Sequence, residues 1–172
     1  MTESEVSGIP VLRLEPRERA DGQHLIYTHG GGYVRPPITA HWWILDRITR
    51  DTGVTVTVQL YRLAPEGDAE QAYSALRAVY VRTVAEAGAA NIRLVGDSAG
   101  GALALGQAIT YRDRGEPLPR QVALFSLHLD LTTLSNPPGD TGTRATRSHA
   151  ERSATRGPAD CGWAASNVSS PG

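Results

Sequence analysis

The sequence predicts an α/β domain whose mostly parallel sheet is flanked by helices. Over residues 10–129, apolar runs of strand length alternate with longer segments whose apolar residues recur every three or four positions. Glycines gather in the turns between these segments. The chain has 172 residues, of which 40% are hydrophobic, which is enough for one hydrophobic core. Strands that alternate with helices favour parallel pairing, because each helix returns the chain to the same end of the sheet.

Four elements are expected in the first half of the chain. Residues 10–16 alternate apolar and polar side chains, which predicts a strand. Residues 23–33 are a short apolar run that ends in three glycines, which predicts a buried strand followed by a loop with unusual backbone angles. Residues 38–53 have helical spacing and end at Gly53, which can close a helix. Residues 54–63 are rich in β-branched side chains and predict a strand.

The second half repeats this alternation. Residues 68–88 form the clearest helix, which Asp68 can cap and a glycine can end. Residues 91–96 and 120–129 are expected to be strands, and residues 100–115 a helix. The apolar side chains of the first of these helices lie along one stripe: Ala72, Ala75, Leu76, Val79, Tyr80 and Val84.

The composition of the chain changes near Pro137. Residues 137–172 consist mainly of Ala, Gly, Ser, Thr, Arg and Pro. Such a segment buries too little apolar surface to offset its ordering entropy. We therefore expect residues 1–136 to be a truncated domain and residues 137–172 to be a disordered tail. We hypothesise that the reading frame shifts near this point, which nucleotide sequencing across the junction would test.

Charge and composition exclude several classes of partner. The net charge of −1 gives no electrostatic reason to bind nucleic acid or an anionic membrane. The single Cys161 excludes an intrachain disulfide framework and fits a reducing compartment. The first ten residues lack the pattern of a signal peptide, and no apolar run is long enough for a membrane span. The sequence therefore predicts a cytoplasmic protein without a transmembrane segment, and it leaves the oligomeric state open.

A serine stands on a glycine-rich corner between a predicted strand and a predicted helix. Gly96-Asp97-Ser98-Ala99-Gly100 fits the Gly-x-Ser-x-Gly nucleophile elbow, in which small neighbours permit a strained turn. The helix that follows would point free N–H groups at an oxygen that becomes negative when the serine attacks a carbonyl. The alternatives are a glycine-rich turn without chemistry, or a phosphate-binding turn. The sequence lacks the Gly-Lys-Ser/Thr and Gly-x-Gly-x-x-Gly patterns that would favour phosphate.

A second motif follows the strand predicted near residue 25. His29-Gly30-Gly31-Gly32-Tyr33 matches the oxyanion loop of lipases and esterases. Three glycines expose backbone N–H groups and let a substrate oxygen approach. We expect His29 to shape this loop, because in this fold the general base follows the nucleophile along the chain. His24 and His41 also precede Ser98, and we expect them to be surface or packing residues.

Taken in order, the motifs resemble those of one enzyme family. HGGGY at residues 29–33, YRLAPE at 61–66, GDSAGG at 96–101 and SLHLDLT at 126–132 are similar to the hormone-sensitive-lipase-like (GDXG) family of α/β-hydrolase-fold esterases and lipases. The resemblance covers residues 10–136. It implies a partial α/β-hydrolase fold that lacks the last strands, and a cofactor-free, metal-free carboxylesterase or lipase with a serine, an acid and a histidine.

The resemblance also implies roles for single residues. Ser98 would be the nucleophile, and the N–H groups of Gly31, Gly32 and Ala99 would form the oxyanion hole. Residues 61–66 would be a structural turn beside the site. Three positions depart from the family pattern: Leu60, Leu127 and His128.

The acid and the histidine are the largest departure. The family carries them after later strands, beyond the point where the resemblance ends. Only His128 and His149 follow Ser98. His128 lies at the end of the strand expected at 120–129, and Asp130 matches the family's structural aspartate, so we expect both to serve local packing. No strand-like run precedes His149, Asp140 or Asp160. Two hypotheses therefore stand. The chain is a serine ester hydrolase acting on small or medium acyl esters, or it is an inactive truncated hydrolase or ligand-binding pseudoenzyme without a complete triad.

Overall fold

Strands and helices alternate along most of the chain in the computed structural model, which describes residues 1–17 and 20–126. The strands are β1 (Thr2–Val6), β2 (Ile9–Leu14), β3 (His24–Thr28), β4 (Thr55–Gln59), β5 (Ile92–Asp97) and β6 (Gln121–Phe125). The helices are α1 (Thr39–Thr52), α2 (Ala69–Ala87) and α3 (Ser98–Asp113), with a short 3₁₀ turn, η1 (Ala89–Asn91), before β5. This order confirms the predicted α/β class.

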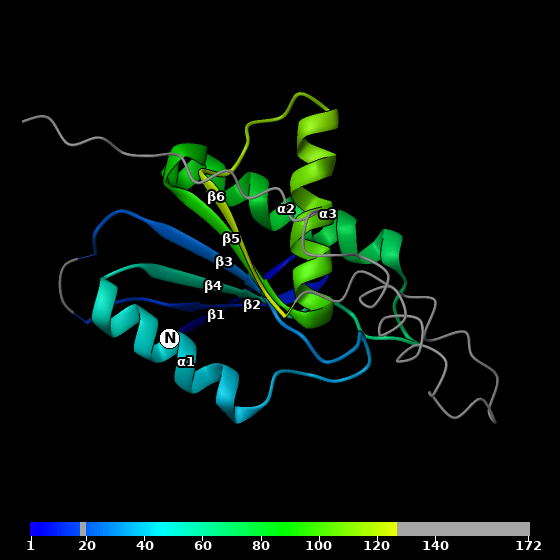
Figure 1. Ribbon diagram of the computed structural model, residues 1–172, viewed down its shortest axis with the longest axis horizontal. Helices are drawn as coiled ribbons and strands as arrows, with labels where there is room; N and C mark the ends of the chain where they lie inside the picture. The colour runs from blue at the N-terminus through cyan, green and yellow to red at the C-terminus, as the bar shows by residue number, and fades with distance from the viewer. Residues whose placement is uncertain (18–19, 127–172) are drawn as a thin grey trace, which may run out of the picture. The chain divides into compact units, whose positions relative to one another are not determined.

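The strands form one mixed sheet in the order β1-β2-β4-β3-β5-β6 (Figure 1). β3, β4, β5 and β6 are parallel, whereas β1 pairs with β2, and β2 with β4, in antiparallel fashion. The expected parallel sheet is therefore correct for the four strands joined by helices. β1 is antiparallel to β2 because a tight hairpin, with no helix between them, joins the two strands.

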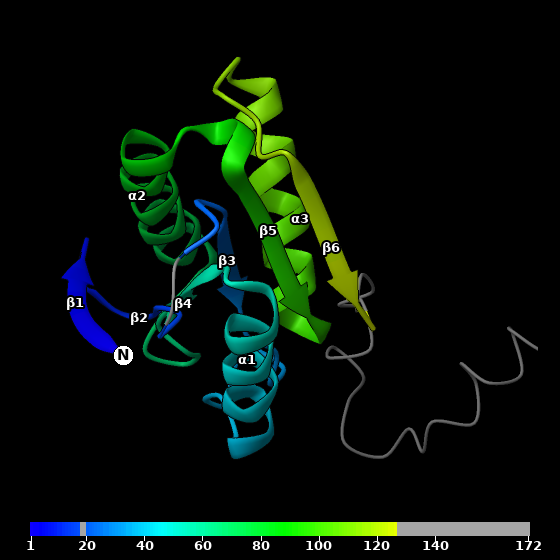
Figure 2. The same ribbon diagram turned by 90° about the vertical axis from the view of Figure 1, so that its left-hand side faces the viewer.

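Helices cover both faces of the sheet. α1 lies on one face, and α2 and α3 lie on the other (Figure 2). The pleat of β3 divides its side chains accordingly: Leu25 and Tyr27 join the core on the α1 side, and Ile26 joins Tyr80 and Tyr111 on the α2 and α3 side. Buried Leu, Ile, Val and Tyr side chains on both faces hold the layers together through the hydrophobic effect.

This connectivity creates a switch point at the carboxyl ends of β3 and β5. The chain leaves β3 for α1 and its strand β4 on one side, and it leaves β5 for α3 and β6 on the other. The two strands are neighbours in register, with Thr28 opposite Gly96. In open α/β sheets, the crevice at such a point is where ligands bind. Both glycine motifs start there.

The predicted N-cap of α2 and the predicted glycine at the end of α1 are confirmed. Asp68 precedes α2 and accepts a hydrogen bond from the Gln71 amide at 2.8 Å, as an N-cap residue does. Gly53 ends α1 with φ 72°, the left-handed conformation that glycine adopts most easily. In the apolar stripe of α2, Val84 is only partly buried. Its neighbour Thr83 is buried, and the Thr83 hydroxyl donates a hydrogen bond to the Val79 carbonyl.

Some boundaries differ from the sequence prediction. β1 was not predicted, because its side chains are exposed or half-exposed at the sheet edge and carry no buried stripe. Its pairing is fixed by a two-residue turn in which Ser7 and Gly8 have φ 50° and 78°. α3 begins at Ser98, two residues before the expected helix start. β6 ends at Phe125, and the expected strand residues 127–129 lie outside the described residues.

The expected tail, residues 137–172, also lies outside the described residues. In the part of the chain that the structure does describe, no helix combines the length and the apolar character needed to cross a membrane.

Candidate active site

Ser98 occupies the corner between β5 and α3. Its φ is 49°, a left-handed conformation that is uncommon for a residue with a side chain and that recurs at functional sites. The turn is tight enough to require the flanking glycines. A Cβ atom on Gly96 would lie 2.3 Å from the Gly100 carbonyl oxygen, and one on Gly100 would lie 2.1 Å from the Thr28 carbonyl oxygen. The elbow is therefore packed directly against the end of β3.

The glycine loop begins immediately after β3. Gly31 has φ 122° and its carbonyl accepts hydrogen bonds from the amides of Val34 and Arg35, at 3.2 and 3.1 Å, which folds the loop back on itself. A side chain at this position would be strained, and its Cβ would lie 2.4 Å from the Arg35 carbonyl oxygen. Within residues 1–17 and 20–126, no protein group accepts a hydrogen bond from the amide of Gly31 or Gly32. Neither N–H group therefore has an acceptor in this part of the chain.

His29 is buried under the loop. Its ring stacks on Tyr61 with centroids 4.5 Å apart, and its Nδ1 lies 2.7 Å from the Gly30 carbonyl oxygen. Tyr61 in turn donates from its hydroxyl to the His29 carbonyl at 3.0 Å. Burial lowers the pKa of His29 below its usual value, so the neutral ring is favoured. These contacts are those of a packing residue.

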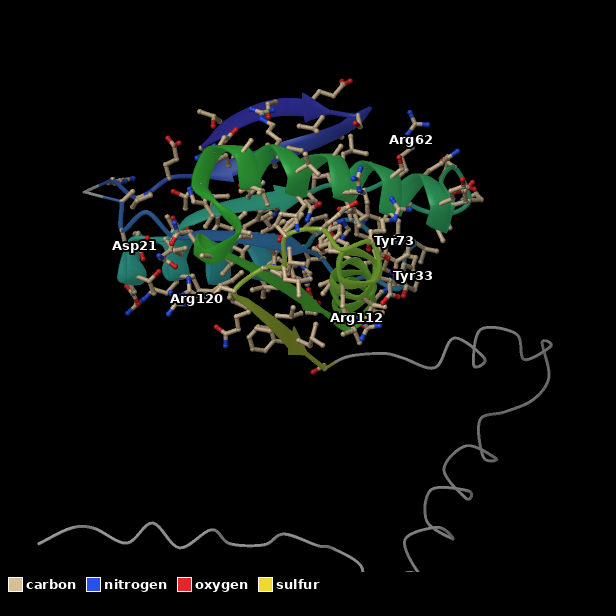
Figure 3. The ribbon with its side chains drawn as sticks, turned by 90° about the horizontal axis from the view of Figure 1, so that it is seen from above. Asp21, Tyr33, Arg62, Tyr73, Arg112 and Arg120 are labelled. Carbon is tan, nitrogen blue, oxygen red and sulfur yellow. The ribbon has the colours of Figure 1, made fainter. Side chains whose placement is uncertain are left out.

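The segment 61–66 braces the same loop. Tyr61 is buried, and the Ala64 amide donates to the Tyr33 carbonyl at 2.9 Å. Tyr33 packs beside Tyr73 of α2 against one hydrophobic cluster (Figure 3). Arg62 lies apart from these two tyrosines in the same view.

The other two histidines in the described residues differ from each other. His24 is at the opposite end of β3, where burial and the charge of Arg13 lower its pKa. His41 lies in the first turn of α1. Its Nδ1 accepts from the Ile38 amide at 2.9 Å, and its Nε2 lies 3.5 Å from Oδ2 of Asp97. The expectation of a surface or packing role missed this contact with the elbow.

Asp97, just before Ser98, contacts β3, the glycine loop and α1. Its Oδ1 accepts hydrogen bonds from the Gly30 amide, at 2.9 Å, and from the Tyr27 hydroxyl. Burial, together with the hydrogen bond to Asp97, raises the pKa of Tyr27, which keeps the phenol protonated as a donor. Sequence reasoning did not find Tyr27. The only signal was its place in the pleat of β3, two residues before the glycine loop.

In the part of the chain that the structure describes, no acid–histidine pair is found hydrogen-bonded to Ser98. His128, His149, Asp130, Asp140 and Asp160 lie outside the described residues. Among residues 1–17 and 20–126, no histidine side chain hydrogen-bonds to Ser98. In the same residues, no group of three or more His, Cys, Asp or Glu side chains is placed to hold a metal ion.

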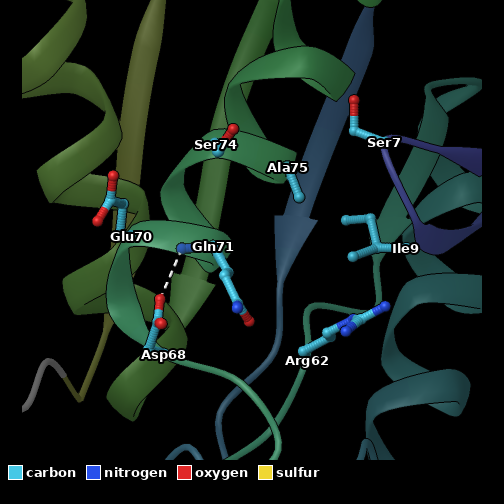
Figure 4. Close-up of a pocket in the computed structure, with 8 residues that line it drawn as sticks. All are labelled: Ser7, Ile9, Arg62, Asp68, Glu70, Gln71, Ser74 and Ala75. Carbon is cyan, nitrogen blue, oxygen red and sulfur yellow. Dashed lines mark hydrogen bonds between the residues drawn. The ribbon is translucent and has the colours of Figure 1, made fainter.

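A separate cavity of about 460 Å³ lies between the β1–β2 turn and the start of α2 (Figure 4). Its walls are mostly polar, and none of them belongs to the predicted site. They are Ser7, Ile9, Arg62, Asp68, Glu70, Gln71, Ser74 and Ala75.

Comparison with known proteins adds a family and several relatives. A family model described as alpha/beta hydrolase fold matches residues 25–167, which extends beyond residue 136. The chain is 35% identical over 127 residues to a triacylglycerol lipase of Mycobacterium tuberculosis, covering 73% of the chain and 29% of that protein. It is 34% identical over 115 residues to an acetyl-hydrolase of Streptomyces hygroscopicus, covering 66% of the chain and 38% of that protein.

Solved structures agree with the sequence relatives. An esterase from the bacterial hormone-sensitive lipase family superposes with a TM-score of 0.70 and 34% identity, over 76% of this chain and 44% of that one. A hormone-sensitive lipase from a metagenome library gives a TM-score of 0.70 and 31% identity, over 76% and 45%. This chain therefore spans less than half the length of the relatives that it matches.

Proposed function

The chain belongs to the hormone-sensitive-lipase-like esterases of the α/β-hydrolase fold, and from this membership we propose that it is built as a serine carboxylic-ester hydrolase with Ser98 as its nucleophile. The observation that carries the proposal is the left-handed Ser98 at the start of α3, packed against the end of β3 where the glycine loop begins. Ser7 has a similar φ of 50° in the β1–β2 turn, so what distinguishes Ser98 is its place at the start of α3 beside the glycine loop.

The proposed reaction is acyl transfer through the serine. Ser98 Oγ attacks the carbonyl carbon of the ester, and the carbonyl π electrons move to the oxygen. The amides of Gly31, Gly32 and Ala99 donate to that oxyanion. A general base would take the Ser98 proton during attack and give it to the departing alkoxide, so that the alcohol leaves as the tetrahedral intermediate collapses. Water then attacks the acyl-enzyme, releases the acid and returns a proton to Ser98 Oγ. No cofactor is needed. A small or medium acyl ester is the proposed substrate, in keeping with the acetyl-hydrolase among the relatives.

A second candidate is favoured by the contacts of the histidines in residues 1–17 and 20–126. The serine proton must pass to a general base within hydrogen-bond reach. In the described residues, His29 is engaged with Gly30 and Tyr61, and His41 faces Asp97. These contacts leave neither ring directed at Ser98, which favours an inactive hydrolase domain or a ligand-binding pseudoenzyme.

The two candidates differ in turnover. We expect hydrolysis of p-nitrophenyl acetate and butyrate near background, with at best slow labelling of Ser98 by a fluorophosphonate. When the triad of a serine hydrolase is removed, the oxyanion hole and substrate binding alone still accelerate the reaction only about 10³–10⁴-fold over the rate in water. The measurement is turnover together with mass-spectrometric mapping of the labelled residue, for the protein, for Ser98→Ala and for Ser74→Ala as a matched control on α2.

Each outcome decides between the candidates. Rapid, stoichiometric Ser98 labelling with steady turnover would rule out the inactive candidate, and His149→Ala and His128→Ala would then identify the base. Turnover that persists in Ser98→Ala would refute the nucleophile assignment. We also propose a cytoplasmic location, which the single Cys161 supports.

A further inference from the structure

Asp97 stands at the N-cap position of α3 but does not cap that helix. Its backbone is extended, with φ −116° and ψ 146°, as an N-cap residue requires, yet its side chain accepts no hydrogen bond from the first turn. Asp68 shows the ordinary arrangement at the start of α2, where its carboxylate accepts from the Gln71 amide. The same residue type at the same position in two helices of one chain is therefore used differently.

The carboxylate of Asp97 is turned toward the neighbouring strand and loop. It accepts hydrogen bonds from the Gly30 amide, at 2.9 Å, and from the Tyr27 hydroxyl, and it lies 3.5 Å from Nε2 of His41. The loop packs directly on it, because a Cβ atom on Gly30 would lie 2.2 Å from Oδ2. One side chain thus joins the elbow, the end of β3, the glycine loop and α1.

We propose that Asp97 is a positioning residue that ties the glycine loop to the elbow and leaves the first amides of α3 open to an oxyanion. This inference rests on the proposed function. A capping carboxylate would occupy an N–H group of the first turn and place a negative charge where the substrate oxygen becomes negative. With the carboxylate directed to Gly30 and Tyr27, the helix terminus keeps its donors, and the next residues of the loop, Gly31 and Gly32, are held at a fixed distance from Ser98.

The hydrogen bond to Gly30 supplies a direct readout. In the wild-type protein, the Gly30 amide should exchange with deuterium at least about tenfold more slowly than the amide of Gly22, an exposed loop glycine. Asp97→Ala should abolish this difference. Asp97→Asn should keep most of it, because the amide oxygen can still accept. Asp68→Ala, which removes the capping carboxylate of α2, should leave the exchange of Gly30 unchanged.

The rate of Ser98 phosphonylation by a fluorophosphonate is the second readout, since that reaction also places negative charge on an oxygen at the site. Asp97→Ala should label about 10- to 100-fold more slowly than wild type, the range expected when oxyanion donors lose their position. Asp97→Asn should recover most of the rate, and Asp68→Ala should label at the wild-type rate. A residue with only a general structural role would change the melting temperature without this recovery by Asn.

The outcomes separate this inference from the proposed function. If wild-type Ser98 is not labelled, the proposed function fails, and the exchange of Gly30 still tests Asp97. Unchanged protection of Gly30 in Asp97→Ala would overturn the inference. If Asp97→Ala does not fold, Asp97→Asn and the wild-type comparison of Gly30 with Gly22 decide: equally fast exchange of the two wild-type amides, or loss of Gly30 protection in a folded Asp97→Asn, would overturn it too.

Discussion

Replacing Gly100 by alanine tests the packing that creates the elbow. The added Cβ would lie 2.1 Å from the Thr28 carbonyl oxygen and 2.4 Å from the His29 carbonyl oxygen. Since real Cβ contacts essentially never fall below 3.0 Å, α3 and the end of β3 must separate by about 1 Å. Strand β3 cannot yield easily, because it is paired with β4 on one side and β5 on the other.

The expected magnitude follows from two opposing terms. Overpacking of a rigid site costs up to about 3 kcal/mol. Alanine is a better helix former than glycine by about 0.5–1 kcal/mol, which offsets part of that cost. The net loss in the free energy of unfolding is therefore about 2 kcal/mol, or a fall in melting temperature of about 4–8 °C for a chain of this size.

Gly106→Ala is the matched control for this substitution. It places the same methyl group in the same helix, but there the nearest atoms belong to the end of the Tyr73 side chain, 2.1 Å away, which can move aside. We expect its melting temperature to stay within about 2 °C of wild type or to rise. Thermal unfolding followed by circular dichroism measures both variants. A Gly100→Ala variant as stable as wild type, or more stable than Gly106→Ala, would refute the packing of the elbow against β3.

Three further predictions concern other parts of the fold. Tyr27→Phe removes one of the donors to the Asp97 carboxylate, so we expect a loss of about 1–3 kcal/mol in the free energy of unfolding; urea denaturation measures it, and an unchanged midpoint would count against this hydrogen bond. Burial lowers the pKa of His29, so the unfolded chain binds its proton more readily, and stability should be full at pH 7.5 and fall below about pH 6.5. His29→Gln should reduce that fall in a pH series of melting temperatures, and an identical slope would exclude His29 as its source. Phe125 is 59% exposed at the end of β6, which pairs only with β5 among the described residues. Phe125→Glu should therefore reduce concentration-dependent self-association in sedimentation velocity, and equal association of the two proteins would show that this edge is not the contact.

The sequence by itself determined the features that depend on neighbours along the chain. Asp68 and Gly53 mark the ends of two helices because capping involves residues within one turn of each other. The alternation of strands and helices predicted the α/β class. The motif Gly96-Asp97-Ser98-Ala99-Gly100 predicted that Ser98 lies between a strand and a helix. The order of these motifs along the chain was also enough to indicate the family, which the comparisons confirmed.

Contacts between distant segments were decided only by the tertiary structure. The Asp97 carboxylate meets Tyr27, 70 positions earlier, because β3 and β5 are adjacent and in register, which no local pattern records. The same pairing lets the N-cap residue of α3 bond to a loop instead of to its own helix, and the packing of α1 places His41 near Asp97. β1 is formed by pairing at a sheet edge, where exposed side chains leave no hydrophobic period to detect. The sequence specifies the chemical type of each side chain, but the groups that it contacts depend on which strands lie side by side in the folded sheet.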